Sequence, residues 1–140
     1  MIKKLNASKE IEVRFSEVDS MGIVWHGSYA KYFEDAREEF GKIFNLGYLR
    51  IFAEGYYAPL VNLDFSYKKP LVYGDKAIVE IEYVNTDSAK ICFNYKILSS
   101  KDKSLIATGS SVQVFLDKDY QLLWNNPDFY LQWKIKNQLS

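Results

Sequence analysis

Asp19 and His26 are the side chains best placed in this sequence to do chemistry, because both lie shortly before an amphipathic helix. A free aspartate has a pKa of ~3.9, so at neutral pH it can act as a base for water or as a nucleophile. Backbone N–H groups at a helix N-terminus favour negative charge that develops on a carbonyl oxygen. Together these groups are suited to acyl transfer, and the sequence leaves both mechanisms open.

The helix that positions them is predicted from a run of apolar residues spaced three or four apart, with charged residues on the opposite face. The apolar residues are Tyr29, Tyr32, Phe33, Ala36, Phe40, Ile43 and Phe44. Residues 19–26 lack this period and include Gly22, so we expect a loop that leads to the helix start.

After the helix, the apolar residues alternate with polar ones, which predicts strands with one buried face. The predicted strands lie near 10–15, 61–68, 77–83, 89–97 and 106–116. Small residues at 108–110 would tolerate a bulge or a close contact. Local connections favour antiparallel pairing, so we expect an α+β fold in which one long helix covers a curved sheet of about five strands.

The length of 140 residues predicts one domain, 1–140, with a C-terminal extension over about 120–140. Within the extension, Asn126-Pro127-Asp128 is typical of a helix start with Pro127 in the first position, and 129–136 could form a short helix. The sequence gives no role for this segment.

Composition argues against several classes of protein. Eighteen basic and eighteen acidic residues cancel and only three are arginines, so we expect no nucleic-acid partner. No apolar run is long enough for export or membrane insertion, which favours the cytoplasm. One histidine and one cysteine, Cys92, cannot form a clustered metal site or an internal disulfide.

The segment around Asp19 carries a family resemblance. In order, its motifs are Val13-Arg14-Phe15, Glu17-Val18-Asp19, Gly22-Ile23-Val24-Trp25-His26, Tyr29 and Phe33-Glu34-x-Ala36-Arg37. This pattern resembles the hot-dog-fold acyl-CoA thioesterases of the hydroxybenzoyl-CoA thioesterase and YbgC type. The resemblance implies a sheet wrapped around the helix and hydrolysis of an acyl thioester to a free acid and coenzyme A. It implies no cofactor, since coenzyme A is part of the substrate.

The resemblance also implies roles for individual residues. Asp19 matches the catalytic carboxylate, and the backbone N–H of His26 matches the group that polarises the thioester carbonyl, while the role of the imidazole stays open. The residues expected to contact substrate are Gly22, Ile23, Val24, Trp25, Tyr29, Lys68 and Lys69. The two lysines could hold the phosphates of coenzyme A, although a solvated lysine pair at a strand end is the simpler interpretation.

Two other functions stay open, a hot-dog hydratase or dehydratase and a non-catalytic acyl-CoA or acyl-carrier binding module. A hydratase or dehydratase usually carries an Asn-Pro or Phe-Pro-Gly motif near the histidine, and this sequence has neither there. A binding module would not need Asp19. Serine hydrolysis is disfavoured because no G-x-S-x-G motif occurs.

Self-association is expected as well. One helix and one curved sheet leave sheet edges uncovered, and an aromatic content of 16% offers apolar surface to a partner. The resemblance implies a homodimer with each active site at the interface, and pairing of dimers into a tetramer stays open.

Overall fold

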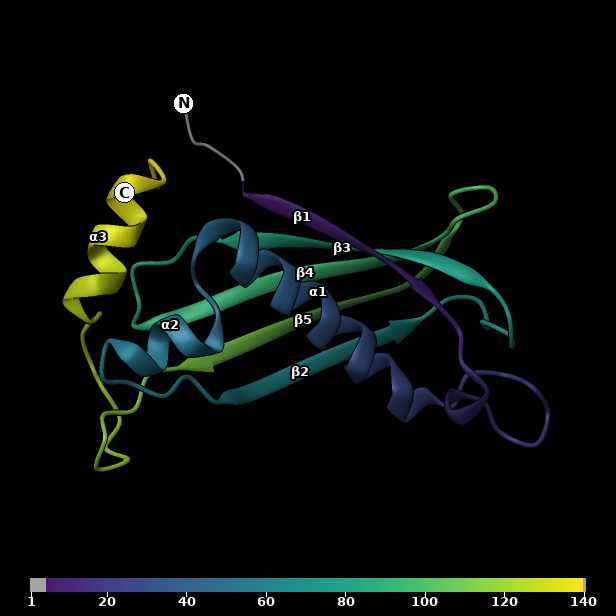
Figure 1. Cartoon of the computed structure of the whole chain (residues 1–140), viewed down its shortest axis with the longest axis horizontal. Coiled ribbons are helices and arrows are strands. Elements are labelled where there is room, and N and C mark those ends of the chain that lie inside the picture. The colour runs from purple at the N-terminus through teal and green to yellow at the C-terminus, as the bar shows by residue number, and fades with distance from the viewer. Residues whose placement is uncertain (1–4, 140) are drawn as a thin grey trace.

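Five antiparallel strands curve around one long helix in the computed structural model, which describes residues 5–139 (Figure 1). The strands are β1 (Asn6–Glu12), β2 (Leu60–Tyr67), β3 (Lys76–Val84), β4 (Lys90–Ser99) and β5 (Leu105–Val114). The helices are α1 (Tyr29–Phe44), α2 (Tyr48–Ala53) and α3 (Asp128–Lys136), with 3₁₀ turns at Phe15–Glu17 and His26–Ser28. The strand order is β1-β3-β4-β5-β2, and all neighbours are antiparallel. The predicted α+β architecture is confirmed.

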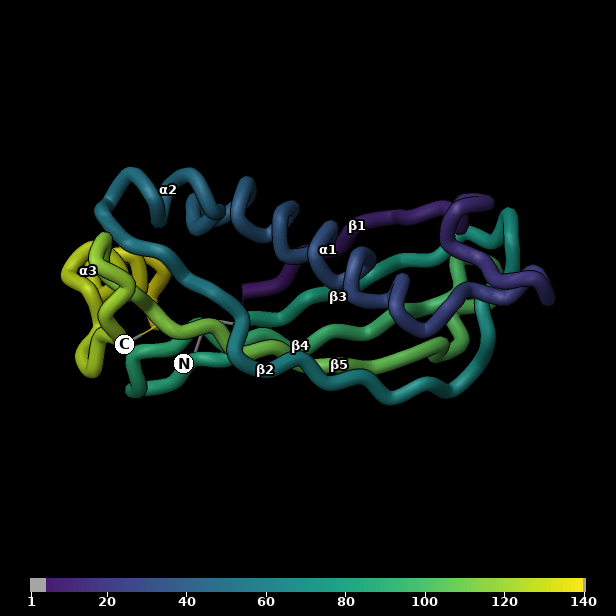
Figure 2. The backbone as a smooth tube through the Cα atoms, turned by 90° about the horizontal axis from the view of Figure 1, so that it is seen from below, coloured from purple at the N-terminus to yellow at the C-terminus, as the bar shows by residue number. Residues whose placement is uncertain are grey.

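Figure 2 shows α1 lying along one face of the sheet, and the buried side chains of the core lie between them. Alternation puts every second residue of β3 and β4 inward, and the register pairs Ile81 with Tyr95 across the two strands. From the helix, Phe33, Ala36 and Phe40 are completely buried against this face. Burial of a large apolar side chain stabilises a fold by roughly 1.5–3 kcal/mol, so this contact dominates the position of α1.

The predicted close contact in the small-residue segment lies at Gly109. The Phe33 ring stacks on Tyr95 at 4.4 Å and on Phe65 at 5.2 Å between centroids. A Cβ added at Gly109 would lie 2.3 Å from the Phe33 ring and 2.6 Å from the Asp64 carbonyl oxygen. Only glycine lets the helix approach β5 this closely.

The first strand differs from its prediction over 10–15, since β1 is already present at Asn6 and ends at Glu12. Beyond it, Val13 donates its N–H to Asp75, and the chain then turns through the 3₁₀ segment. The helix α2 was not predicted, because its six residues are too short to show a helical period.

The C-terminal segment packs against the end of the core where α1 finishes, at the left of Figure 1. The predicted short helix is present as α3, although Pro127 precedes its first residue. Trp133 donates from its indole Nε1 to the carbonyl of Phe44 at 2.7 Å, and Phe129 and Tyr130 are buried. Within residues 5–139, no helix has the length and apolar character needed to cross a membrane.

Gly109→Ala should destabilise the fold by about 1–3 kcal/mol, because the new methyl group meets a buried ring and a backbone carbonyl that cannot move apart. The free energy of unfolding from urea titration measures this. Ser110→Ala, at the next residue on the outer face, is the control and should change it by less than about 0.5 kcal/mol. Equal unfolding midpoints for wild type and Gly109→Ala would contradict the proposed constraint.

Candidate active site

The turn before α1 is held by the side chain of Asp19. Its Oδ1 accepts hydrogen bonds from the N–H groups of Met21 at 2.9 Å and Ile23 at 3.4 Å. Gly22 lies in this turn with φ +76°, a conformation that glycine adopts without steric cost. Such turns fix an aspartate relative to its own backbone. The second oxygen, Oδ2, has no hydrogen-bond partner among the described residues and is free to meet a substrate or water.

A shallow hollow of about 330 Å³ brings most of the predicted site residues together. These are Asp19, Ile23, Val24, Trp25, His26, Tyr29, Lys68 and Lys69. Gly22 does not line the hollow, and its backbone bonds to Asp19 within the turn and to Tyr73. Tyr67 and Pro70 complete the lining and were not predicted. Tyr67 precedes Lys68 and lies on the apolar phase of its strand, a signal that could have identified it.

The floor of the hollow is the start of α1. Ser28 donates its N–H to the Trp25 carbonyl at 2.8 Å, and Tyr29 donates to His26. The hydrogen bonds among residues 5–139 leave the N–H groups of His26 and Gly27 unpaired. Two adjacent unpaired donors at a helix N-terminus can bind a carbonyl oxygen as it gains negative charge.

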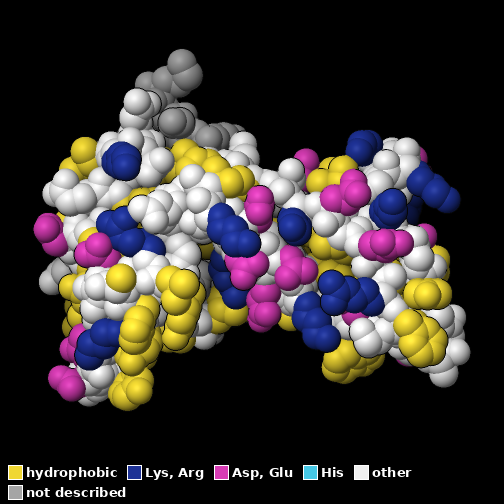
Figure 3. All heavy atoms as spheres, in the orientation of Figure 1, with side chains coloured by type: hydrophobic (Ala, Val, Ile, Leu, Met, Phe, Trp, Pro, Cys, Tyr) yellow, Lys and Arg dark blue, Asp and Glu magenta, His cyan; other side chains and the backbone are white. Residues whose placement is uncertain are grey.

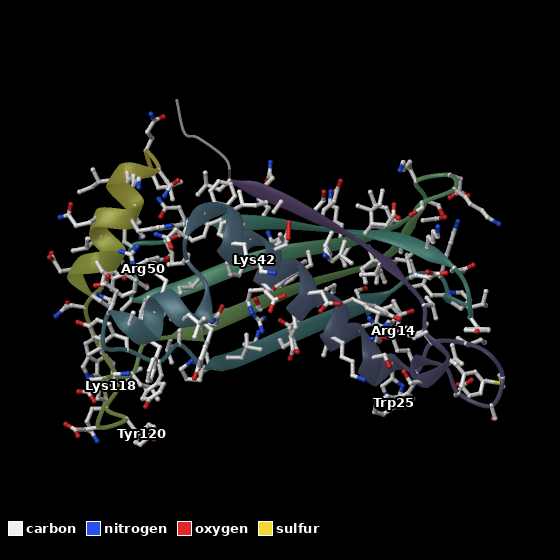
Figure 4. All side chains as sticks on the ribbon, in the orientation of Figure 1. Arg14, Trp25, Lys42, Arg50, Lys118 and Tyr120 are labelled. Atoms are coloured by element: carbon white, nitrogen blue, oxygen red, sulfur yellow. The ribbon has the colours of Figure 1, made fainter. Side chains whose placement is uncertain are left out.

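Trp25 covers this helix start from outside, and Figure 4 shows it beside the first turn of α1. A Cβ added at Gly27 would lie 2.0 Å from the indole, so the ring rests directly on the glycine. The centroids of Trp25 and His26 are 5.2 Å apart, and both side chains are exposed. The imidazole therefore lies at the rim of the hollow.

Two tyrosines form the wall between the helix and β2. The rings of Tyr29 and Tyr67 meet edge to face at 4.9 Å, and the Tyr67 hydroxyl donates to the His26 carbonyl at 3.3 Å. Tyr29 is buried, and this burial raises the pKa of its hydroxyl above the ordinary value. The Tyr29 hydroxyl therefore keeps its proton at neutral pH and can donate a hydrogen bond.

A buried carboxylate, Glu17, connects the segments that carry the site. Its Oε1 accepts the N–H of Arg14 and the hydroxyl of Tyr32, both at 2.9 Å. Its backbone carbonyl accepts the N–H of Trp25 at 2.9 Å and the Ser28 hydroxyl at 3.4 Å. One residue thus joins the exit of β1, the end of the loop and the first turns of α1.

The lysine pair lies on the opposite rim of the hollow. Both backbone N–H groups donate to the carbonyl of Ile106, so the ends of β2 and β5 fix the backbone of Lys68 and Lys69. Both side chains are exposed. The two ammonium groups can therefore meet an anionic group outside the hollow without disturbing its lining.

Comparison with known proteins identifies the class. A family model described as "Thioesterase-like superfamily" matches residues 13–133, so the chain belongs to that superfamily. It is 36% identical over 109 residues to the Bacillus subtilis protein named "Putative acyl-CoA thioesterase YneP", covering 77% of this chain and 79% of that protein. The predicted family is confirmed at this level, while the hydroxybenzoyl-CoA thioesterase and YbgC branch stays a prediction.

Two further relatives carry more specific names. A Staphylococcus aureus structure described as a DHNA-CoA thioesterase superposes with a TM-score of 0.84 at 27% identity, covering 95% of this chain and 91% of that one. The Arabidopsis thaliana protein named "Acyl-acyl carrier protein thioesterase ATL3, chloroplastic" is 28% identical over 112 residues, covering 80% of this chain and 59% of that protein.

Tyr32→Phe should lower the free energy of unfolding at neutral pH by about 1.5–3 kcal/mol, the usual value of a hydrogen bond to a charged group. Burial and the bond to Glu17 raise the pKa of Tyr32 well above the ordinary tyrosine value. Above about pH 10 an unfolded tyrosine loses its proton while Tyr32 keeps it, so stability falls as pH rises.

As pH rises above 10, the free energy of unfolding should therefore fall less steeply in Tyr32→Phe than in wild type. The two slopes should differ by up to about 1.4 kcal/mol per pH unit. Urea unfolding over a pH series measures both effects, with Tyr48→Phe at an exposed position as the control. Parallel pH curves for wild type and Tyr32→Phe would contradict the assignment of this hydrogen bond.

Proposed function

We propose that this protein hydrolyses acyl-CoA thioesters to a free carboxylic acid and coenzyme A. The observation that carries the proposal is one hollow lined by both Asp19 and His26, at a helix start where the N–H groups of His26 and Gly27 are unpaired. A carboxylate and two oxyanion donors are the minimum set for attack on a thioester carbonyl. Membership of the thioesterase-like superfamily supports the same chemistry.

In the proposed reaction, the thioester oxygen accepts hydrogen bonds from His26 and Gly27, which stabilise the negative charge of the tetrahedral intermediate. Asp19 acts in one of two ways. As a base it takes a proton from water, whose hydroxide adds to the carbonyl carbon. As a nucleophile it forms an anhydride that water then cleaves. In both routes the carbon–sulfur bond breaks and the thiolate of coenzyme A leaves with a proton from the solvent or the base.

We place the coenzyme A arm on the side of Lys68 and Lys69, because two exposed ammonium groups suit its phosphates. The Bacillus subtilis relative is named for acyl-CoA, which favours this carrier, whereas the Arabidopsis thaliana relative is named for acyl carrier protein. A parallel assay with both carriers separates these sources. The cytoplasmic location and the absence of a cofactor stay predictions.

We further propose that the active form is a homodimer joined along β2. This strand is an edge of the sheet, and its outer side pairs with no strand among the described residues. Such an edge invites pairing with another chain. The hollow is open and lies at the end of β2, so a second subunit placed there would close it.

Asp19→Asn should reduce kcat/KM by about a hundredfold or more, because the amide keeps the shape but cannot act as base or nucleophile. His26→Ala should cost less, since the proposed oxyanion donor is its backbone N–H. Thiol release from a panel of acyl-CoA thioesters measures both. Near-normal turnover by Asp19→Asn would refute the role of Asp19, and an equal loss in folded His26→Ala would give the imidazole the central role.

Val61→Lys should convert the dimer to a monomer and remove most of the activity, because it adds a charge to an exposed apolar position on the β2 edge. The matched variant Ser8→Lys, on the other edge strand β1, should stay dimeric and active. Light scattering at the assay concentration, together with thiol release, gives both readouts. A wild-type monomer with full activity would contradict the shared site.

A further inference from the structure

A second hollow, of about 720 Å³, lies beside the C-terminal half of α1 and is bounded by α2 and the start of β2. It is on the same side of α1 as the candidate active site, because both hollows are lined by α1 residues on one side and by residues in or next to β2 on the other. Figure 3 shows a notch in this margin of the molecule, between its two ends. The side chain of Arg37 lines this second hollow.

Arg37 is half-buried and turned inward, and four carboxylates at 34, 35, 38 and 39 are its neighbours in sequence. Within residues 5–139 it forms no ion pair. Its one hydrogen bond there joins Nη1 to the hydroxyl of Tyr95 at 3.4 Å, and that hydroxyl is 2.7 Å from the Ser111 hydroxyl. A guanidinium has five N–H donors. Most of those on Arg37 are therefore free to bind an acceptor in the hollow.

The other two basic side chains that line the hollow each form an ion pair. Lys42 Nζ lies 3.6 Å from Glu38 Oε1, and Arg50 Nε lies 3.0 Å from Glu54 Oε2. Glu34 is exposed, where water and salt weaken its effect on a bound anion. Arg37 is thus the cationic group whose charge is available inside the hollow.

The remaining wall of the hollow is largely apolar. It includes Leu60 from β2 and the inward side chains Ile91 and Phe93 from β4. Such a wall suits methylene groups, while a guanidinium suits a carboxylate. The ligand that matches both is an aliphatic chain with an acid at its end.

The proposed thioester site fixes the direction of this ligand. Coenzyme A leaves the hollow past Lys68 and Lys69, so the acyl chain leaves on the other side of the carbonyl, along α1. From Tyr29 to Arg37 is eight residues of α-helix, about 12 Å. An extended chain gains roughly 1.2 Å per bond, so about ten bonds cover this distance.

We propose that Arg37 binds a carboxylate at the far end of the acyl chain, and that the substrates are monothioesters of medium-length dicarboxylic acids. The inference rests on the proposed thioesterase function and adds the substrate class. Arg37 is a specificity residue in this account, and it takes no part in cleavage of the thioester.

The test compares kcat/KM for two pairs, decanedioyl-CoA with decanoyl-CoA and butanedioyl-CoA with butanoyl-CoA, in wild type, Arg37→Met and Lys31→Met. The wild type should prefer decanedioyl-CoA over decanoyl-CoA by at least tenfold, as expected for a charge-assisted pair. Butanedioyl-CoA should gain nothing from its acid, because it is too short to reach. Arg37→Met should remove the preference, and Lys31→Met, an exposed lysine on the same helix, should keep it.

Because the readout is a ratio of two substrates on one enzyme, partial unfolding of a variant does not change it. Equal rates for decanedioyl-CoA and decanoyl-CoA in wild type, or an unchanged ratio in Arg37→Met, would overturn the role of Arg37 and leave the thioesterase function standing. Absence of hydrolysis with every thioester would overturn the proposed function and this inference together.

Discussion

The contact between the Phe33 ring and Gly109 sets the distance between α1 and the sheet, and the site depends on that distance. With a side chain at 109 the helix would have to move away from β5. Tyr29, one helical turn earlier, would then lose its edge-to-face contact with Tyr67, and the wall between the helix start and β2 would open. Glu17 links the position of α1 to the loop. Its carboxylate accepts a hydrogen bond from Tyr32 of the helix, and its backbone carbonyl accepts one from Trp25.

The local part of this arrangement can be predicted from sequence, because it depends on neighbours along the chain. The period of α1, the alternation of the later strands and the loop from Asp19 to His26 all follow from residue spacing. The remaining parts depend on contacts between distant segments. Tyr67 reaches His26 only because β2 pairs with β5, and the end of β1 is set by the bond from Val13 to Asp75. The grouping of Arg37 with Tyr95 is equally long-range.

The C-terminal segment shows how a region without a family motif can still be explained by packing. Tyr130 lies against Tyr83 and Phe115, and its hydroxyl donates to the Lys90 carbonyl at 3.0 Å. Lys134 is buried and donates to the Thr86 carbonyl at 2.5 Å, and burial lowers the pKa of its ammonium group. These bonds seal the end of the core opposite the candidate active site. The candidate active site and the hollow beside Arg37 lie away from this segment, on the β2 side, where a substrate and a second subunit are proposed to bind.

The central claim is that the thioester carbonyl is held at the start of α1 in front of Asp19. A crystal structure of Asp19→Asn with an unhydrolysed acyl-CoA tests it most directly. The account predicts the carbonyl oxygen about 3 Å from the N–H groups of His26 and Gly27, the carbonyl carbon facing residue 19, and coenzyme A on the side of Lys68. A thioester bound elsewhere, such as on the outer face of the sheet, or a carbonyl turned away from the helix start, would contradict it.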